Sequence, residues 1–167
     1  MAKFDIAVLG GGPGGYVAAI RAAQLRKKVA IIDKDRLGGI CLNWGCIPTK
    51  ALLKSAQVFE YIQHAEDYGI QVKDAKADFG SMINRSRDVA NGMSKGINFL
   101  FRKNKITTIE GEGRLLRGKK VEVTDKDGKK ATYEAPHIIV ATGARARQLP
   151  KKRSSYGHQD FLGRTPK

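Results

Sequence analysis

A glycine-rich turn near the N-terminus restricts the fold of this 167-residue chain more than any other feature. The turn spans residues 10–15 and reads GGGPGG. It follows an apolar run at residues 3–9 and opens a helical pattern at residues 13–24. A second apolar run, at residues 29–33, ends in an acid. Strand, glycine turn, helix and strand in this order begin a doubly wound parallel sheet, so we expect an α/β fold of the Rossmann type.

The glycines of this turn indicate a bound dinucleotide. Gly10 allows the tight turn, Gly12 lets the backbone approach a pyrophosphate, and Gly15 lets the helix lie close to the strand. Gly14 lies at the helix start, whose N-terminus attracts phosphate charge. Asp33, 23 residues after Gly10, is placed to accept hydrogen bonds from an adenosine ribose and disfavours a 2′-phosphate. The pattern does not distinguish FAD from NAD, and a glycine-rich turn without ligand stays an alternative.

Two cysteines, Cys41 and Cys46, are the only ones in the chain. We expect Cys41 in a loop at residues 34–43 and Cys46 at the start of a helix over about residues 45–64. A disulfide between them would close a small ring, which suits reversible chemistry more than stability. The helix N-terminus also favours a thiolate on Cys46. Zinc needs about four ligands, which the three histidines do not supply at a suitable spacing. Two inert core cysteines stay an alternative.

The fingerprint and the cysteine segment together resemble the pyridine nucleotide-disulfide oxidoreductases. Residues 41–53, CLNWGCIPTKALL, are most similar to the dihydrolipoyl dehydrogenase branch of that family. The resemblance implies FAD as the cofactor and Cys41 and Cys46 as the catalytic pair. It implies that Cys46 faces the flavin and Cys41 exchanges with the dithiol substrate. Lys50, one helical turn after Cys46, is then expected to contact the flavin, although a solvated helix lysine is the alternative.

Three further positions complete the expected FAD site. Lys34 follows Asp33 directly at the end of the second strand. Thr142 and Gly143 belong to the segment at residues 138–144, IIVATGA, which reads as a buried strand followed by a glycine turn. In the family that this segment resembles, such an Ala-Thr-Gly motif marks the place where the chain leaves the FAD domain. No metal ligands are predicted.

The rest of the chain predicts helices and short strands. We expect a second long helix within residues 79–103, β runs at 107–112, 120–124 and 131–134, a hairpin turn at 125–128, and an apolar strand at 137–141. The predicted fold is a Rossmann-like FAD-binding domain with a parallel sheet, helices and a small antiparallel β-meander. We expect residues 1–150 to form this domain, partial relative to the family that the sequence resembles. We expect residues 151–167 to form a basic tail without family resemblance.

The resemblance also implies an activity. It implies a dihydrolipoamide:NAD+ oxidoreductase, with NAD as electron acceptor and the dihydrolipoamide of 2-oxoacid dehydrogenase complexes or the glycine cleavage system as substrate. A second glycine fingerprint for NAD and the dimerisation domain do not follow, so we expect a truncated form that is inactive alone. Homodimers are expected of full-length relatives. The alternatives are an inactive remnant that binds adenine nucleotide only, and another disulfide reductase, acting on glutathione or mercuric ion.

The net charge of +15 suggests an anionic partner, but the basic residues are spread in short clusters along the chain. No aromatic residues are interleaved with a basic stripe, as a single-strand binder requires, so we expect no nucleic-acid partner. No run of 18 apolar residues occurs, so we expect no membrane span. No signal peptide is visible, and two cysteines fit a reducing compartment, so a cytoplasmic location is expected.

Overall fold

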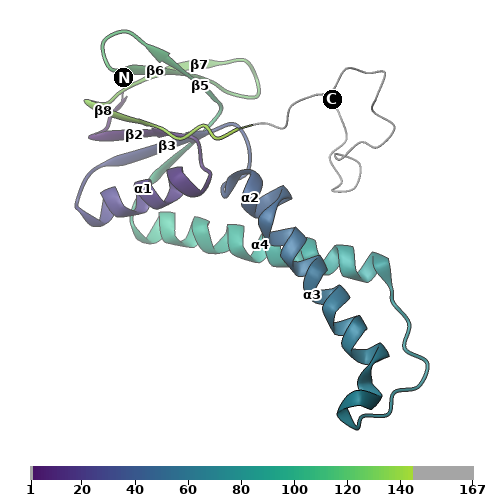
Figure 1. Ribbon diagram of the computed structural model, residues 1–167. Coiled ribbons are helices and arrows are strands. Elements are labelled where there is room, and N and C mark those ends of the chain that lie inside the picture. The colour runs from purple at the N-terminus through teal and green to yellow at the C-terminus, as the bar shows by residue number, and fades with distance from the viewer. Residues whose placement is uncertain (1, 145–167) are drawn as a thin grey trace.

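The computed structural model describes residues 2–144 (Figure 1). The predicted basic tail at residues 151–167 and the predicted end of the domain lie outside these described residues. Two four-stranded sheets pack face to face, and helices cover the outer face of one of them (Figure 1). The predicted α/β fold with a parallel sheet is therefore confirmed.

The parallel sheet forms the centre of the domain. Its strands stand in the order β4 (Thr107–Glu110), β3 (Val29–Asp33), β2 (Ile6–Leu9) and β8 (His137–Val140), and all pairs are parallel. Alternate side chains of β2 and β3 enter different cores. Val8 and Ile31 face the helices, whereas Leu9 and Ile32 face the second sheet. Because both faces are covered, the central strands are continuously apolar in sequence.

The second sheet contains the predicted antiparallel meander. β5 (Glu112–Leu116), β6 (Lys120–Thr124) and β7 (Lys130–Glu134) pair antiparallel, and β1 (Ala2–Lys3) joins β7 in parallel. The prediction of one continuous strand at residues 3–9 was wrong. The chain bends at Asp5, whose carboxylate accepts a 2.7 Å hydrogen bond from the Lys28 N–H and whose own N–H donates to the Lys28 carbonyl. This bend sends β1 to one sheet and β2 to the other.

The predicted strand at residues 107–112 also divides between the two sheets. Gly111 separates β4 from β5 with a φ of 151°, a conformation that glycine adopts readily. A Cβ at this position would lie 2.6 Å from the Thr124 carbonyl oxygen, so the crossing also requires a residue without a side chain. The apolar pattern did not indicate this crossing.

Four α-helices and one 3₁₀ turn complete the described fold. They are α1 (Pro13–Gln24), α2 (Gly39–Trp44), α3 (Cys46–Gln63), η1 (Ala65–Tyr68) and α4 (Phe79–Lys103). α1 and part of α4 cover the parallel sheet, while α3 and the rest of α4 extend away from it as a helical hairpin (Figure 1). The two predicted long helices are thereby confirmed.

The predicted loop at residues 34–43 was partly wrong, because α2 occupies its second half. Gly38, with a φ of 106°, turns the chain, and its N–H donates a 2.8 Å hydrogen bond to the Gly11 carbonyl. The Asn43 side chain then donates to the carbonyl of Gly39 at 3.1 Å and thus stabilises the short helix. Cys41 consequently lies in a helix and not in a loop.

Candidate functional site

A cavity of about 310 Å³ lies at the carboxyl edge of the parallel sheet. Five of the residues predicted to bind the cofactor contribute to its wall: Gly10, Asp33, Lys34, Thr142 and Gly143. The carboxyl ends of parallel strands converge at one edge, which is where ligands bind in open α/β sheets. The structure thus brings together segments that are more than 100 residues apart in the sequence.

The sequence prediction missed one whole segment of this cavity wall, which contains Gly111, Glu112 and Gly113. They lie where the chain crosses from β4 to β5. Glu112 forms a 3.0 Å ion pair with the Lys34 ammonium. A Cβ at Gly113 would lie 2.9 Å from a Leu9 methyl carbon, so glycine keeps this wall close to β2. The two glycines at positions 111 and 113 could have indicated a break in the strand predicted over residues 107–112, although the apolar pattern continued through it.

Asp33 is held between the glycine turn and the loop that follows β3. One carboxylate oxygen accepts a hydrogen bond from the Gly11 N–H, and the other accepts one of 2.8 Å from the Asp35 N–H. The side chain is only half-buried. Each carboxylate oxygen offers about two acceptor positions, so both can accept a further hydroxyl hydrogen bond.

The predicted glycines fall into two groups according to what surrounds them. A Cβ at Gly15 would overlap the Gly10 carbonyl oxygen, and a Cβ at Gly10 would overlap the Ala141 carbonyl oxygen. Glycine is therefore required at these two positions by the fold. A Cβ at Gly12 or at Gly14 would meet its nearest neighbour only at 3.9 Å. The protein itself leaves space at these two positions, which a ligand can approach.

The N-terminus of α1 is open to an anion. No side chain caps it, and its first turn contains no acidic residue. The first N–H groups of a helix have no intrahelical acceptor, and the helix dipole places partial positive charge there. An uncapped N-terminus of a 12-residue helix beside Gly12 is suited to bind a phosphate group.

Cys41 and Cys46 form a disulfide across the junction of α2 and α3, with their Cα atoms 4.7 Å apart. Cys41 is half-buried in α2, whereas Cys46 is exposed at the first position of α3. Gly45 lies between the two helices, where a Cβ would come 3.2 Å from the Ile40 carbonyl oxygen. The predicted pairing is confirmed, and Lys50 lies exposed in α3 one turn beyond Cys46.

α2 connects the glycine turn to the disulfide. Its first residue, Gly39, lies so close to the glycine turn that a Cβ there would come within 2.7 Å of the Gly12 Cα. Cys41 follows two residues later in the same helix, about 3 Å along its axis, and is bonded to Cys46 at the start of α3. Cys41, Cys46 and Lys50 do not line the 310 Å³ cavity, but α2 fixes the distance between the two parts of the site.

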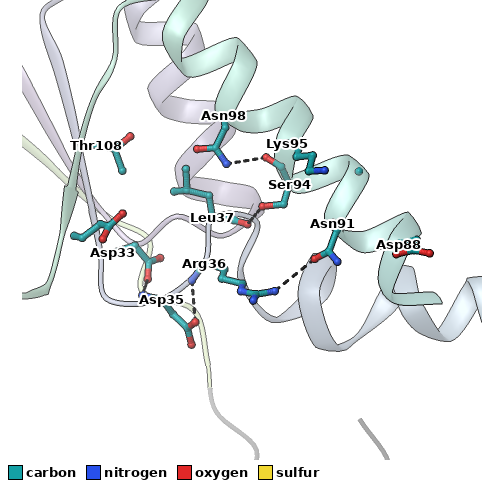
Figure 2. Close-up of a pocket in the computed structure, with 12 residues that line it drawn as sticks. Asp33, Asp35, Arg36, Leu37, Asp88, Asn91, Ser94, Lys95, Asn98 and Thr108 are labelled. Atoms are coloured by element: carbon teal, nitrogen blue, oxygen red, sulfur yellow. Dashed lines mark hydrogen bonds between the residues drawn. The ribbon is translucent and has the colours of Figure 1, made fainter. Parts of the chain in front are cut away.

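A larger polar cavity of about 570 Å³ lies between the β3–α2 loop and α4 (Figure 2). Of the predicted site residues, only Asp33 lines it. Two hydrogen bonds cross its floor, from Arg36 to the Asn91 side chain at 3.5 Å and from the Ser94 hydroxyl to the Leu37 carbonyl at 3.3 Å. These bonds attach the loop before α2 to α4 and so help to position α2.

Two further features of the described chain concern membranes and metals. Within residues 2–144, no helix combines the length and the apolar character needed to cross a bilayer. In the same part of the chain, no three His, Cys, Asp or Glu side chains are grouped so that they could hold a metal ion.

Comparison with known proteins adds independent information. Residues 4–165 match the model of the pyridine nucleotide-disulphide oxidoreductase family. A dihydrolipoyl dehydrogenase of Zymomonas mobilis subsp. mobilis is 53% identical over 155 residues, covering 93% of this chain and 33% of that protein. Dihydrolipoyl dehydrogenases of Rhizobium etli and of Pisum sativum mitochondria are 45% and 40% identical, over 89% and 87% of this chain. The chain spans about a third of the length of these relatives.

Proposed function

Because the chain belongs to the pyridine nucleotide-disulphide oxidoreductase family, we propose that it binds FAD and exchanges electrons with a dithiol through Cys41 and Cys46. One observation carries this proposal. Cys41 is the third residue of α2, whose first residue contacts the glycine turn that would hold the dinucleotide, and Cys46 begins the next helix. The redox pair and the nucleotide cradle are therefore held at a fixed separation by one short helix.

The residues present fit an FAD molecule. The open space at Gly12 and Gly14 and the uncapped N-terminus of α1 would receive the pyrophosphate. Asp33 would accept hydrogen bonds from the ribose hydroxyls, and the cavity beside it would receive the adenine. Lys50, on the α3 face one turn after Cys46, would lie against the flavin. When bound, FAD supplies an acceptor and donor for two electrons.

The thiol chemistry follows from the disulfide. A substrate thiolate attacks the Cys41 sulfur, the Cys41–Cys46 bond breaks, and Cys46 leaves as a thiolate. The second substrate thiol, deprotonated in turn, attacks the substrate sulfur of the mixed disulfide and releases Cys41. The substrate becomes a disulfide, the protein becomes a dithiol, and two electrons have been transferred. The N-terminus of α3 stabilises the thiolate on Cys46, because the helix dipole is positive there.

The substrate of this proposal is a dihydrolipoyl group. The names of the matched relatives support it, since those cited above are dihydrolipoyl dehydrogenases. The proposal extends to NAD as the final electron acceptor, to lipoamide-bearing 2-oxoacid dehydrogenase complexes or the glycine cleavage system as partners, and to a homodimer of the full-length form. We also propose a cytoplasmic location, because disulfides in a reducing compartment are usually transient and catalytic.

The test uses the full chain with added FAD. We expect FAD to co-elute in gel filtration, and we expect dihydrolipoamide to reduce the disulfide under anaerobic conditions, with two thiols per chain becoming alkylated. Glutathione should reduce it less completely at equal thiol concentration. Cys41→Ser is the matched control, because it retains the cradle and should bind FAD without forming the pair. A chain that elutes without flavin contradicts the FAD assignment.

A further inference from the structure

We propose that Arg87 of α4 is a positioning residue for the Cys41–Cys46 disulfide and acts through the backbone of Asn43. The inference rests on the proposed function, since it assumes that the disulfide opens and closes by thiol exchange. Arg87 is 41 residues from Cys46 in the sequence, and no motif of the chain includes it. Only the packing of α4 against α2 brings the two regions together.

The contact lies between the two cysteines. Arg87 Nη1 donates a 3.0 Å hydrogen bond to the carbonyl oxygen of Asn43, which belongs to the last turn of α2. The last carbonyls of a helix have no intrahelical donor, and in a helix of six residues they form most of the element. The guanidinium therefore supplies an external donor at the point where α2 ends and the chain turns into α3.

Asn43 is anchored at its other end as well. Its side chain is 5% exposed, and its amide Nδ2 donates to the carbonyls of Leu37 and Gly39, both at 3.1 Å. The side chain thus fixes the start of α2, while Arg87 fixes the end of the helix. With both ends held, the Cys41 Sγ stays near the first turn of α3, where Cys46 lies.

The arrangement of Arg87 is unfavourable in one respect. Its second guanidinium nitrogen, Nη2, is buried and has no hydrogen-bond partner among the described residues. Burial of a donor without an acceptor destabilises a protein, and most buried polar groups avoid it. A half-buried guanidinium held in this way is consistent with a role at Asn43 that a surface arginine could not fulfil.

This geometry has a measurable consequence. The equilibrium between disulfide and dithiol depends on the effective concentration of one thiol at the other, which falls when the segment carrying them becomes mobile. Loss of the Arg87–Asn43 bond should therefore favour the dithiol. Loss of positive charge alone has the opposite sign, because it destabilises a thiolate and so favours the disulfide. The direction in which the disulfide–dithiol equilibrium shifts therefore distinguishes a positioning role of Arg87 from an effect of its charge.

The experiment measures the equilibrium of the full chain with reduced and oxidised dithiothreitol. Two electrons pass from the dithiothreitol thiols to the Cys41–Cys46 bond, and the reagent becomes a cyclic disulfide. After an acid quench, alkylation and mass measurement give the dithiol fraction. We expect Arg87→Met to shift the equilibrium toward the dithiol by about tenfold, which is about 30 mV for a two-electron couple. Arg87→Lys, which keeps the charge and one donor, should restore most of the wild-type value.

Arg85→Met is the matched control. Arg85 lies on the same helix, and its Nη1 donates an equivalent 3.0 Å hydrogen bond to a backbone carbonyl, that of Ala51 in α3. This substitution removes the same charge and the same kind of bond at a position that does not lie between the cysteines. We expect it to shift the equilibrium by less than about twofold, which is about 9 mV on the same scale.

The outcomes separate the inference from the proposed function. Equal shifts in Arg87→Met and Arg85→Met, or a shift toward the disulfide in Arg87→Met, overturn the role of Arg87. Wild-type cysteines that never reach equilibrium with dithiothreitol overturn the proposed function itself. Circular dichroism checks folding. If Arg87→Met does not fold, Arg87→Gln takes its place, because its amide ends two bonds short of the guanidinium nitrogens and keeps a polar surface.

Discussion

Replacing Gly12 with alanine should weaken FAD binding by about tenfold or more without weakening the fold. Gly12 has a φ of −73° and a ψ of −176°, an extended conformation that alanine adopts without strain. The new Cβ would find its nearest protein atom at 3.9 Å, which is an ordinary van der Waals contact. The folded chain therefore has room for the methyl group, but a pyrophosphate lying against this backbone does not.

The expected magnitudes follow from these contacts. A glycine-to-alanine change at a compatible position reduces the entropy of the unfolded chain and stabilises a protein by about 0.4–1 kcal/mol. The melting temperature should accordingly stay the same or rise by about 1–4 °C. FAD affinity should fall, because a pyrophosphate displaced from the N-terminus of α1 loses hydrogen bonds that contribute about 1.5–3 kcal/mol each to a charged group. One lost bond corresponds to about tenfold or more in Kd.

Gly15→Ala is the comparison variant for Gly12→Ala, because the fold itself requires glycine at position 15. Its Cβ would overlap the Gly10 carbonyl oxygen and lie 2.9 Å from the carbonyl carbon, and neither atom can move without shifting the turn. Overpacking of this kind destabilises a protein by about 1–3 kcal/mol, and backbone contacts place it at the upper end. We expect the melting temperature to fall by about 6–12 °C for a domain of this size.

The assay combines thermal unfolding followed by circular dichroism with a titration of FAD against the quenching of flavin fluorescence. Gly12→Ala should keep or slightly raise the melting temperature and bind FAD more weakly, whereas Gly15→Ala should melt at a lower temperature. A Gly12→Ala chain that binds FAD with the wild-type Kd refutes the reasoning, because the open space at Gly12 would then have no ligand. A Gly12→Ala chain whose melting temperature falls as far as that of Gly15→Ala refutes the assumption that the protein leaves space at position 12.

Three further predictions concern other parts of the chain. Thiol titration of air-oxidised and reduced protein should differ by two groups per chain, and two freely alkylated cysteines in the oxidised folded protein would contradict the disulfide. ADP should bind better than 2′-phospho-ADP, and Asp33→Asn should reduce this difference; equal binding by the unmodified chain excludes the role given to Asp33. The Ser81 hydroxyl and N–H, which donate to Asp78 at the start of α4, lower the pKa of that carboxyl below 3.8. Because the folded pKa is lowered, the ionised cap stabilises the fold above pH 3.8 and is lost as the pH falls below it. Asp78→Ala should therefore lower the urea midpoint at pH 7 but not near pH 2, and a difference that persists in acid rules out this cap.

Local patterns in the sequence were sufficient for the central βαβ unit and the disulfide-bonded cysteine pair. The order of apolar strand, glycine turn and helix is encoded within about 30 residues, and it predicted β2, α1 and β3 with Asp33 as the last residue of β3. The same holds for Cys41 and Cys46, which are five residues apart. Their pairing needs no distant part of the chain. These features were predictable because each depends on neighbours in sequence, where turn geometry and helical spacing are fixed by the backbone.

Contacts between distant segments decided the rest. The division of the predicted strand at Gly111 depends on the Thr124 carbonyl, and the wall at Gly113 depends on Leu9 in another strand. α2 forms where periodicity indicated a loop, because Gly38 bonds to Gly11 and Asn43 is held by Arg87, 44 residues away. A short helix gains little from local propensity and needs such tertiary bonds to persist. The sequence by itself therefore determined the glycine turn, the acid at the end of β3 and the cysteine pair. The crossing at Gly111 and the packing of α2 between the glycine turn and α4 decided what else lines the cavity and how far apart these groups stand.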